Sequence, residues 1–221
     1  MMRRTLLLGS LAWPGAAQQV LYQPLPPTGS AYLRIVNATA ELLIIRANTI
    51  GHVSLGTDPL QRASPYAVQE AVADRPVELA FTAGSARGDM TLLVEPGSFN
   101  TLIVVTDGAA LRTMPVVDQT QFNQTRARLT FYNATTGCAA AGLVLDPDGQ
   151  SVFADVQQGT ARMRSVNPVS AQVRVACGAS RSAPFALGAL EAGGQYSVWM
   201  MMVSGQPIGF VTRDTITPWR P

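Results

Sequence analysis

The sequence is poor in the side chains on which much enzyme chemistry depends: its 221 residues include one histidine, two cysteines and no lysine. The histidine, His52, follows Gly51 in a predicted turn and has no acidic residue close to it in the sequence. A Ser-His-Asp mechanism would have to use His52 as its base, and we predict an ordinary loop residue instead. One imidazole and two thiols are also too few for a typical metal site, so we expect no metal.

Other catalytic signatures are missing as well. The sequence has no Gly-x-Ser-x-Gly nucleophile motif and no glycine-rich loop for phosphate. The carboxylates of Asp146 and Asp148 are explained by turn chemistry, and a glycosidase pair stays open without positive support. We therefore predict that the protein is not an enzyme and binds no cofactor.

Charged residues make up only 14% of the chain, and the net charge of +2 includes Arg3 and Arg4. These two arginines begin a predicted signal peptide, residues 1–17, in which a short apolar stretch leads to small residues at 15–17. We expect export to the periplasm, by the general or the twin-arginine route. Without the leader the net charge is zero, which disfavours nucleic acid as a partner. No later apolar run is long enough to span a membrane.

The chain repeats itself. Residues 31–39, Ala-Tyr-Leu-Arg-Ile-Val-Asn-Ala-Thr, return at 127–135 as Ala-Arg-Leu-Thr-Phe-Tyr-Asn-Ala-Thr, and Asp118 returns as Asp214, also 96 residues later. Two copies are too few for a solenoid. We predict two tandem modules at 28–119 and 126–221, joined by a linker at 120–125 and preceded by a Pro-rich arm at 18–27.

The hydrophobic pattern predicts strands nearly throughout. Residues 32–36, 77–81, 129–131 and 169–175 alternate with period two, which is typical of strands with one face in water. Residues 42–45, 101–105 and 197–203 are continuously apolar and suit central strands or strands at the contact between modules. Asp-Pro-Asp-Gly at 146–149 predicts a hairpin, and residues 65–73 have helix potential over at most two turns. The fold class expected is all-β, with two antiparallel β-sandwiches of immunoglobulin-like or carbohydrate-binding-module-like type.

Both cysteines, Cys138 and Cys177, fall in the second module. In an oxidising compartment they favour a structural disulfide, with two buried thiols as the alternative. The Asn-Ala-Thr triplets at 37–39 and 133–135 fit a glycosylation pattern, but an asparagine that bonds local backbone at a strand end explains the repeat better.

Candidate binding residues follow from composition alone. Arg162 and Arg164 are two apart and so share one face of a strand, and with Arg174 and Arg181 they could form a basic strip for a polyanion or an acidic partner. A solvated surface is the alternative. Trp219 is a candidate for stacking on a sugar, whereas the other aromatic residues of the second module suit the core.

Residues 21–38 suggest a family. They read Leu-Tyr-x-Pro-x-Pro-Pro-x-Gly-Ser-Ala-Tyr-Leu-Arg-Ile-Val-Asn-Ala, which resembles the opening of AlgF, the periplasmic accessory protein of alginate O-acetylation, and the plan of two β-modules extends the resemblance over the mature chain. The resemblance implies a non-catalytic component that works beside a membrane-bound O-acyltransferase and periplasmic hydrolase-like acetyltransferases. The cysteine pair and the lack of lysine depart from the family and leave the polymer open.

Two functions are therefore expected from the sequence. The first is a periplasmic adapter for O-acetylation of an exopolysaccharide, either alginate or an alginate-like or cellulosic polymer. The alternative is a free-standing, secreted carbohydrate-binding or cell-surface structural protein.

Overall fold

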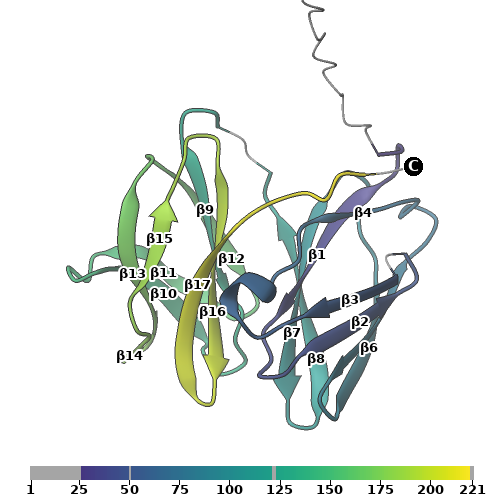
Figure 1. Cartoon of the computed structure of the whole chain (residues 1–221), viewed down its shortest axis with the longest axis horizontal. Helices are drawn as coiled ribbons and strands as arrows, with labels where there is room; N and C mark the ends of the chain where they lie inside the picture. The colour runs from purple at the N-terminus through teal and green to yellow at the C-terminus, as the bar shows by residue number, and fades with distance from the viewer. Residues whose placement is uncertain (1–25, 50, 121–122, 220–221) are drawn as a thin grey trace, which may run out of the picture.

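The computed structural model describes residues 26–49, 51–120 and 123–219, and these residues form an all-β protein (Figure 1). The predicted signal peptide, residues 1–17, and most of the predicted arm, residues 18–27, lie outside the described residues. The described helical structure is one 3-10 turn, η1 (Pro59–Gln61). In the part of the chain that the structure describes, no helix has the length and apolar character needed to cross a membrane.

The first half of the described chain forms one sheet bent over a hydrophobic core. Its strands are β1 (Ala31–Asn37), β2 (Leu43–Ala47), β3 (Gly51–Leu55), β4 (Ala67–Gln69), β5 (Val77–Ala83), β6 (Ala86–Leu92), β7 (Phe99–Asp107) and β8 (Ala110–Asp118). They lie in the order β3-β2-β5-β6-β8-β7-β1-β4. A single residue pair, Arg87 with Ala110, joins β6 to β8. The sheet therefore folds there into two layers, with Leu33, Phe81 and Leu102 in the core between them.

The second half forms a sandwich of two separate sheets. Its strands are β9 (Ala127–Asn133), β10 (Ala140–Asp146), β11 (Ser151–Gln157), β12 (Ala161–Val166), β13 (Ser170–Cys177), β14 (Ser180–Arg181), β15 (Phe185–Ala189), β16 (Gln195–Val203) and β17 (Gln206–Arg213). One sheet has the order β11-β10-β13-β14, with β15 also paired to β13, and the other β12-β9-β16-β17. Phe131, Leu143, Val175 and Val198 are buried between the two sheets.

The strand pairing of the first half recurs in the second with the same register. Tyr32 lies opposite Phe99 in the parallel pair β1/β7, and Arg128 lies opposite Gln195 in β9/β16, each 96 residues further along. The sequence repeat is therefore also a repeat of strand pairing. The division into independent modules at 28–119 and 126–221 stays a prediction.

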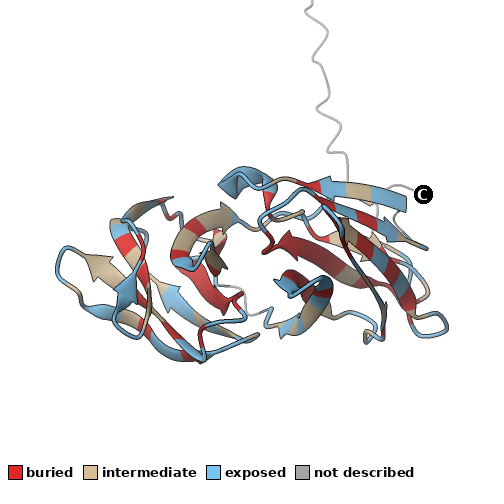
Figure 2. Ribbon diagram, turned by 90° about the horizontal axis from the view of Figure 1, so that it is seen from below, coloured by how far each residue is buried: buried red, intermediate tan, exposed pale blue. Residues whose placement is uncertain are grey.

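A third hydrophobic core lies between the two halves. It brings Val36 and Ile103 of the first half against Trp199 and Met201 of the second. Figure 2 shows the buried, red stretches of strand where the halves meet. Strands β1, β7, β9 and β16 are consequently covered on both faces, and the apolar runs 101–105 and 197–203 lie at the contact between the halves, as expected.

Two of the expected burial patterns are wrong. Residues 32–36 and 129–131 do not keep one face in water, because each strand is covered by the other half. Conversely, residues 42–45 are not continuously buried: Leu42 is 52% exposed and Ile44 38%. The outer face of β2 meets solvent, so its side chains alternate despite their uniform hydrophobicity.

The local predictions for turns and helices have mixed outcomes. The hairpin at 146–149 is confirmed between β10 and β11, with Gly149 at a φ of 71°. The helix potential at 65–73 is wrong, because Ala67–Gln69 pairs with β1 as strand β4. Hydrogen bonds to an available strand edge outweigh the weak helix preference of so short a segment.

Asn37 and Asn133 each end a central strand with a buried side-chain amide. Asn37 Nδ2 donates to the carbonyl oxygens of Leu55 and Gly56 at 3.0 and 2.9 Å. Asn133 Nδ2 donates to the carbonyl oxygen of Val156 at 3.0 Å. Both amides thus fasten the end of a central strand to backbone of the opposite layer. Each also donates to local backbone, as expected: Asn37 Nδ2 to the carbonyl oxygen of Glu41 at 2.8 Å and Asn133 Nδ2 to that of Cys138 at 2.9 Å.

We expect Asn37→Ala and Asn133→Ala each to lower the free energy of unfolding by about 1–3 kcal/mol, because buried carbonyls lose their donor. Asn123→Ala is the matched control: Asn123 opens a third Asn-x-Thr triplet, but it is exposed and bonds Thr125 locally. The control should change stability by less than about 0.5 kcal/mol. Urea unfolding measures all three, and equal losses at the three positions would contradict the assignment.

Candidate functional site

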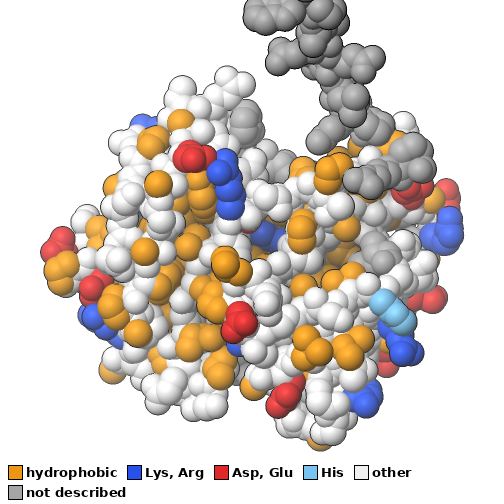
Figure 3. All heavy atoms as spheres, viewed as in Figure 1, with side chains coloured by type: hydrophobic (Ala, Val, Ile, Leu, Met, Phe, Trp, Pro, Cys, Tyr) orange, Lys and Arg blue, Asp and Glu red, His pale blue; other side chains and the backbone are white. Residues whose placement is uncertain are grey.

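The two halves enclose a cavity of about 530 Å³ at one end of their contact. Residues 119–120, where the chain leaves β8, and residues 214–216, where it leaves β17, form part of its wall. The space-filling view shows a hollow between the halves with basic side chains beside it (Figure 3). We call this the junction cavity; its lining includes Tyr66, Phe99, Asp118, Arg128, Arg213 and Asp214.

Arg34 of β1 is buried where the two halves meet, with its side chain only 2% exposed. Its guanidinium donates from Nε to Thr101 Oγ1, from Nη1 to Asp214 Oδ1 and from Nη2 to Tyr132 Oη, each at 2.7 Å. Thr101 belongs to the first half, and Asp214 and Tyr132 belong to the second. A single side chain of the first half is thus bonded to two side chains of the other.

Aromatic rings enclose the same guanidinium. The carbon Cζ of Arg34 lies 4.5 Å from the ring centre of Tyr66, 5.2 Å from that of Tyr132 and 4.8 Å from that of Trp199. Tyr132 and Trp199 are themselves stacked, with ring centres 4.2 Å apart. A desolvated cation over an aromatic face is stabilised by about 2 kcal/mol or more, so these rings add to the ion pair.

The carboxylates of Asp118 and Asp214 occupy equivalent positions in the two halves. Asp118 accepts hydrogen bonds from the hydroxyls of Thr101, Tyr66 and Tyr132 at 2.5, 2.8 and 2.5 Å. Asp214 accepts from Arg34 and, at 2.7 Å, from the hydroxyl of Ser197, the residue 96 positions after Thr101. The repeat has therefore kept an acid with a hydroxyl donor at the junction in both halves. We call these residues, with Arg34 and Arg128, the junction network.

Burial and charge shift the ionisation of the junction network. Burial would lower the pKa of Arg34, but Tyr132, Asp214, Tyr66 and Asp118 around it hold that pKa above its usual value. Burial raises the pKa of Tyr66 and of Tyr132; the charge of Arg34 opposes the rise, and Asp118 adds to it. Arg34 is therefore a cation at neutral pH, and both tyrosines keep the protons that they donate to Asp118.

We expect the protein to lose stability in alkali with a slope set by these two tyrosines. Their pKa values are higher in the folded chain, so their contribution is complete below the unfolded value of about 10 and is lost as the pH rises towards the folded values. Above about pH 10 each tyrosine should remove about 1.4 kcal/mol of unfolding free energy per pH unit. Urea unfolding across this range should therefore give a shallower slope for Tyr66→Phe/Tyr132→Phe than for the wild type; identical slopes would contradict the assignment.

Arg128 is the least compensated charge of the junction network. It is 8% exposed, and its Nη1 donates to the carbonyl oxygen of Gln119 at 2.6 Å. Its Nη2 reaches Asp214 Oδ2 only at 3.5 Å, while its buried Nε finds no hydrogen-bond partner among the described residues. Arg128 also borders a smaller hollow of about 280 Å³ beside Val116 and Met163. Arg128 therefore lines both hollows at the junction.

The chain after β17 crosses back to the first half and forms part of the cavity wall. Tyr66 N donates to the carbonyl oxygen of Thr215, and Thr217 N donates to that of Tyr66. Trp219, a predicted binding residue, is half-buried, and its Nε1 donates to Glu70 Oε1 at 2.6 Å. In Figure 1 this yellow segment runs from the second half to the first. We call residues 214–219 the C-terminal strap.

The four predicted basic residues lie on different sheets of the second half. Arg162 and Arg164 share a face of β12 and donate to the carbonyl oxygens of Ala154 and Val152 at 3.0 and 2.8 Å. Arg174 of β13 pairs with Asp146 at 2.5 Å, and Arg181 lies on β14 of the same sheet. Arg162 and Arg164 thus cover backbone carbonyl groups of β11, the edge strand of its sheet. Covering these groups hinders the edge strand from pairing with another chain. A binding role for the four residues stays a prediction.

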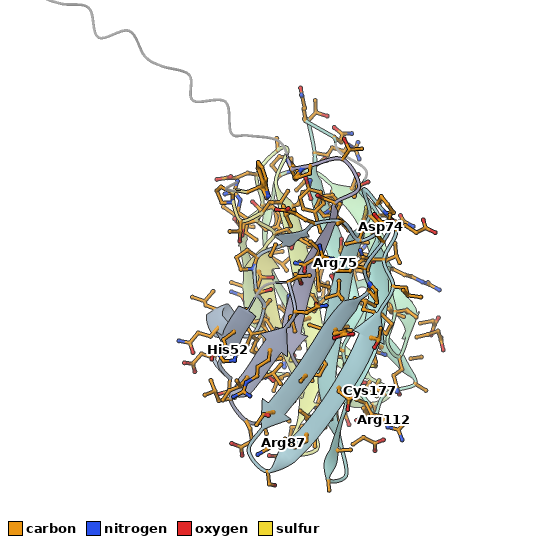
Figure 4. The ribbon with its side chains drawn as sticks, turned by 90° about the vertical axis from the view of Figure 1, so that its right-hand side faces the viewer. His52, Asp74, Arg75, Arg87, Arg112 and Cys177 are labelled. Atoms are coloured by element: carbon orange, nitrogen blue, oxygen red, sulfur yellow. A yellow bond between two sulfur atoms is a disulfide. The ribbon has the colours of Figure 1, made fainter. Side chains whose placement is uncertain are left out.

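The histidine and the cysteines lie away from the junction cavity. His52 lies within the exposed edge strand β3 opposite Arg46, so the expected loop position is wrong. Figure 4 shows His52 at the side of the molecule, apart from Cys177. The predicted disulfide is confirmed between Cys138 and Cys177, whose Cα atoms are 5.8 Å apart. Within the described ranges, no three His, Cys, Asp or Glu side chains come together as metal ligands.

No protein-family model matches the chain, and no curated protein matches it. Function therefore has to be inferred from the residues and from the geometry of the junction. Sequence reasoning missed Arg34 and Arg128 as functional candidates. The recurrence of Asp118 as Asp214 was the one available signal, since it pointed to an acid that both halves retain.

Proposed function

We propose that this chain is a periplasmic, non-catalytic accessory protein in the O-acetylation of an exopolysaccharide, either alginate or an alginate-like or cellulosic polymer. The observation that carries the proposal is the likeness of residues 21–38 to the opening of the AlgF family. In this role the protein positions periplasmic hydrolase-like acetyltransferases beside a membrane-bound O-acyltransferase.

The buried side chains within that likeness support a scaffolding role. Arg34 bonds the two halves together, and Asn37 fastens β1 to the backbone around Leu55. Both groups stabilise the fold. The buried charge of Arg34, the C-terminal strap and the shared core hold the two halves in one orientation. This arrangement suits a protein that must present two surfaces at a fixed distance. Such a body can bridge two partners.

Deleting the gene should remove acetyl groups from the secreted polymer without lowering polymer yield. The reason is that an adapter acts on the transfer of acetyl groups, whereas chain synthesis proceeds without it. Acetyl content and polymer mass are measured in the deletion strain, and in the same strain complemented with the wild-type gene as the control. Unchanged acetyl content after deletion would refute the proposal.

The second candidate function is that of a free-standing carbohydrate-binding protein, and the junction cavity is the observation that favours it. Aromatic rings, a guanidinium and amides around one cavity are the groups with which proteins hold sugars. A pull-down from the periplasm separates the two functions. An adapter should recover acetyltransferases, and a free-standing binder should recover polymer alone.

A further inference from the structure

We infer that the protein pairs with a second copy of itself through the solvent-facing side chains of β3, β2, β5 and β6, related by a two-fold axis. We call this surface the four-strand face. The assignment goes beyond the accessory role and does not depend on it. It rests on three features of the face: its lack of cover, a groove with opposite charges on its two walls, and a strand register that is complementary to itself.

The four-strand face is a layer of sheet that the described chain leaves uncovered. Of the two layers of the first half, the one with β1 and β7 carries the core shared with the second half. The layer with β3, β2, β5 and β6 packs its inner side on the core of the first half and turns its outer side to solvent. Figure 1 shows β2 and β6 on the side of the first half away from the second. Leu42 and Ile44, 52% and 38% exposed, point out from β2 or its start.

A shallow groove runs along β5 through the middle of this face. Two hollows of about 500 and 400 Å³ share Arg46, Ala80 and Asp89 in their lining. Ala80 forms the floor because its side chain is a single methyl group, while Arg46 of β2 and Asp89 of β6 lie on either side of it in one row. Among the described side chains, no ion pair includes Arg46 or Asp89. The walls of the groove therefore carry one unpaired charge of each sign.

The order of residues in this row fits a second copy of the same row. His52, Arg46, Ala80 and Asp89 lie side by side on β3, β2, β5 and β6. Sheets that pack face to face keep their strand directions within about 30° of each other. A two-fold axis parallel to the strands, between β2 and β5, therefore lays β2 over β5 and β3 over β6 of the other copy. Arg46 of each copy then enters the groove of the other over Ala80, beside Asp89, and Asp89 lies over His52.

The neighbouring rows agree with the same axis. Ile44 lies beside Thr82 in the sheet, and Asn48 lies beside Glu78. The axis sets Ile44 of one copy against Thr82 of the other, where a methyl group meets an apolar side chain. It sets Asn48 against Glu78, where an amide can donate to a carboxylate. Each of these contacts occurs twice, because the two copies use the same surface.

Other positions of the axis are less favourable. An axis along β2 would set Arg46 against Arg46 of the other copy, and an axis along β5 would set Glu78 against Glu78. Like charges that face each other across an interface cost binding energy. With the axis between β2 and β5, Arg87 instead lies over Ser54, and no two like charges are directly opposed. The charges of the four-strand face thus select one pairing.

The size of the face indicates a reversible dimer. Four strands about 4.8 Å apart and about six residues long cover roughly 19 by 20 Å, so two copies would bury on the order of 1,000 Å². This area lies near the lower limit for specific association, and the face is largely polar. We therefore expect a dissociation constant of about 10–100 µM.

Sedimentation velocity of the full mature chain from about 1 to about 500 µM tests the assignment. The weight-average sedimentation coefficient should rise from the value of a monomer to that of a dimer and then level off. A monomer over the whole range would overturn the assignment. So would growth beyond the dimer, because a two-fold contact closes after two copies.

Two charge reversals locate the contact. Arg46→Asp brings two carboxylates together at both equivalent contacts, and Asp89→Arg brings two guanidinium groups together, so each variant alone should associate at least about tenfold more weakly. An equimolar mixture of the two variants should dimerise within about threefold of the wild-type affinity. The reason is that each contact of the mixed dimer again joins a carboxylate to a guanidinium.

Arg112→Asp is the matched control, because Arg112 is an exposed arginine of β8, in the other layer and apart from His52 and Arg87 (Figure 4). This variant should dimerise like the wild type. Arg46 and Asp89 are exposed, so their variants should unfold at the same urea concentration as the wild type. Wild-type association of either reversed variant alone, a mixture that stays monomeric, or an equal loss in Arg112→Asp would each overturn the assignment.

Discussion

Replacing Arg34 with methionine should lower the free energy of unfolding by about 3–5 kcal/mol, the usual cost of breaking a buried ion pair from one side. Methionine fills much of the space of the arginine stem, so the loss comes from the charge and not from a cavity. Asp214 would keep only the 3.5 Å contact with Arg128 as an ion pair, in a site where its side chain is 4% exposed. Thr101 and Tyr132 would each lose a hydrogen bond at the same time.

Equilibrium unfolding in urea measures this loss, with Arg112→Met as the control. Arg112 forms an ion pair that is exposed on both sides, and breaking it should change stability by less than about 1 kcal/mol. The position of Arg34 at the contact also predicts where the loss will be seen. If the two halves unfold separately, Arg34→Met should bring the first transition to lower urea, since the bonds between the halves are lost when either half unfolds. A loss below about 1 kcal/mol for Arg34→Met would contradict the view that the buried bonds of Arg34 hold the two halves together.

Features coded by short stretches of sequence could be predicted. The hairpin at 146–149 follows from Pro and Gly at fixed positions, and the disulfide from two cysteines in a chain expected to be exported. The repeat of strand pairing follows from the segments 31–39 and 127–135. In each case the determining residues are close together in the chain or recur at a constant spacing.

The junction could not be predicted from such signals. Period-two alternation places Arg34 on the water-facing side of its strand, yet it is buried because Tyr132 and Asp214, 98 and 180 residues away, cover it. The same missing information explains the errors at residues 129–131 and 42–45. Whether the outer face of a sheet meets solvent or another sheet depends on how the halves dock, and alternation within a strand says nothing about that docking.

Removing the disulfide should have an effect of similar size, but through the unfolded chain. Cys138→Ala/Cys177→Ala opens a loop of 39 residues, and the chain-entropy model gives a loss of about 4 kcal/mol. The native state should change little, because six residue pairs already fix β10 against β13, including Ala141 with Cys177. The first half shows that the arrangement can form without a bridge: Leu43 pairs with Ala83 in the equivalent register.

Comparison of the double variant with the oxidised and the reduced wild-type protein tests this mechanism. If the disulfide acts only by restricting the unfolded chain, the variant and the reduced wild type should lose the same unfolding free energy within about 1 kcal/mol, because neither has the bond that closes the loop. Their folded spectra should match that of the oxidised protein. A double variant as stable as the oxidised protein would show that the bridge is dispensable, whereas a variant that changes the spectrum of Trp199 would place its effect in the folded junction.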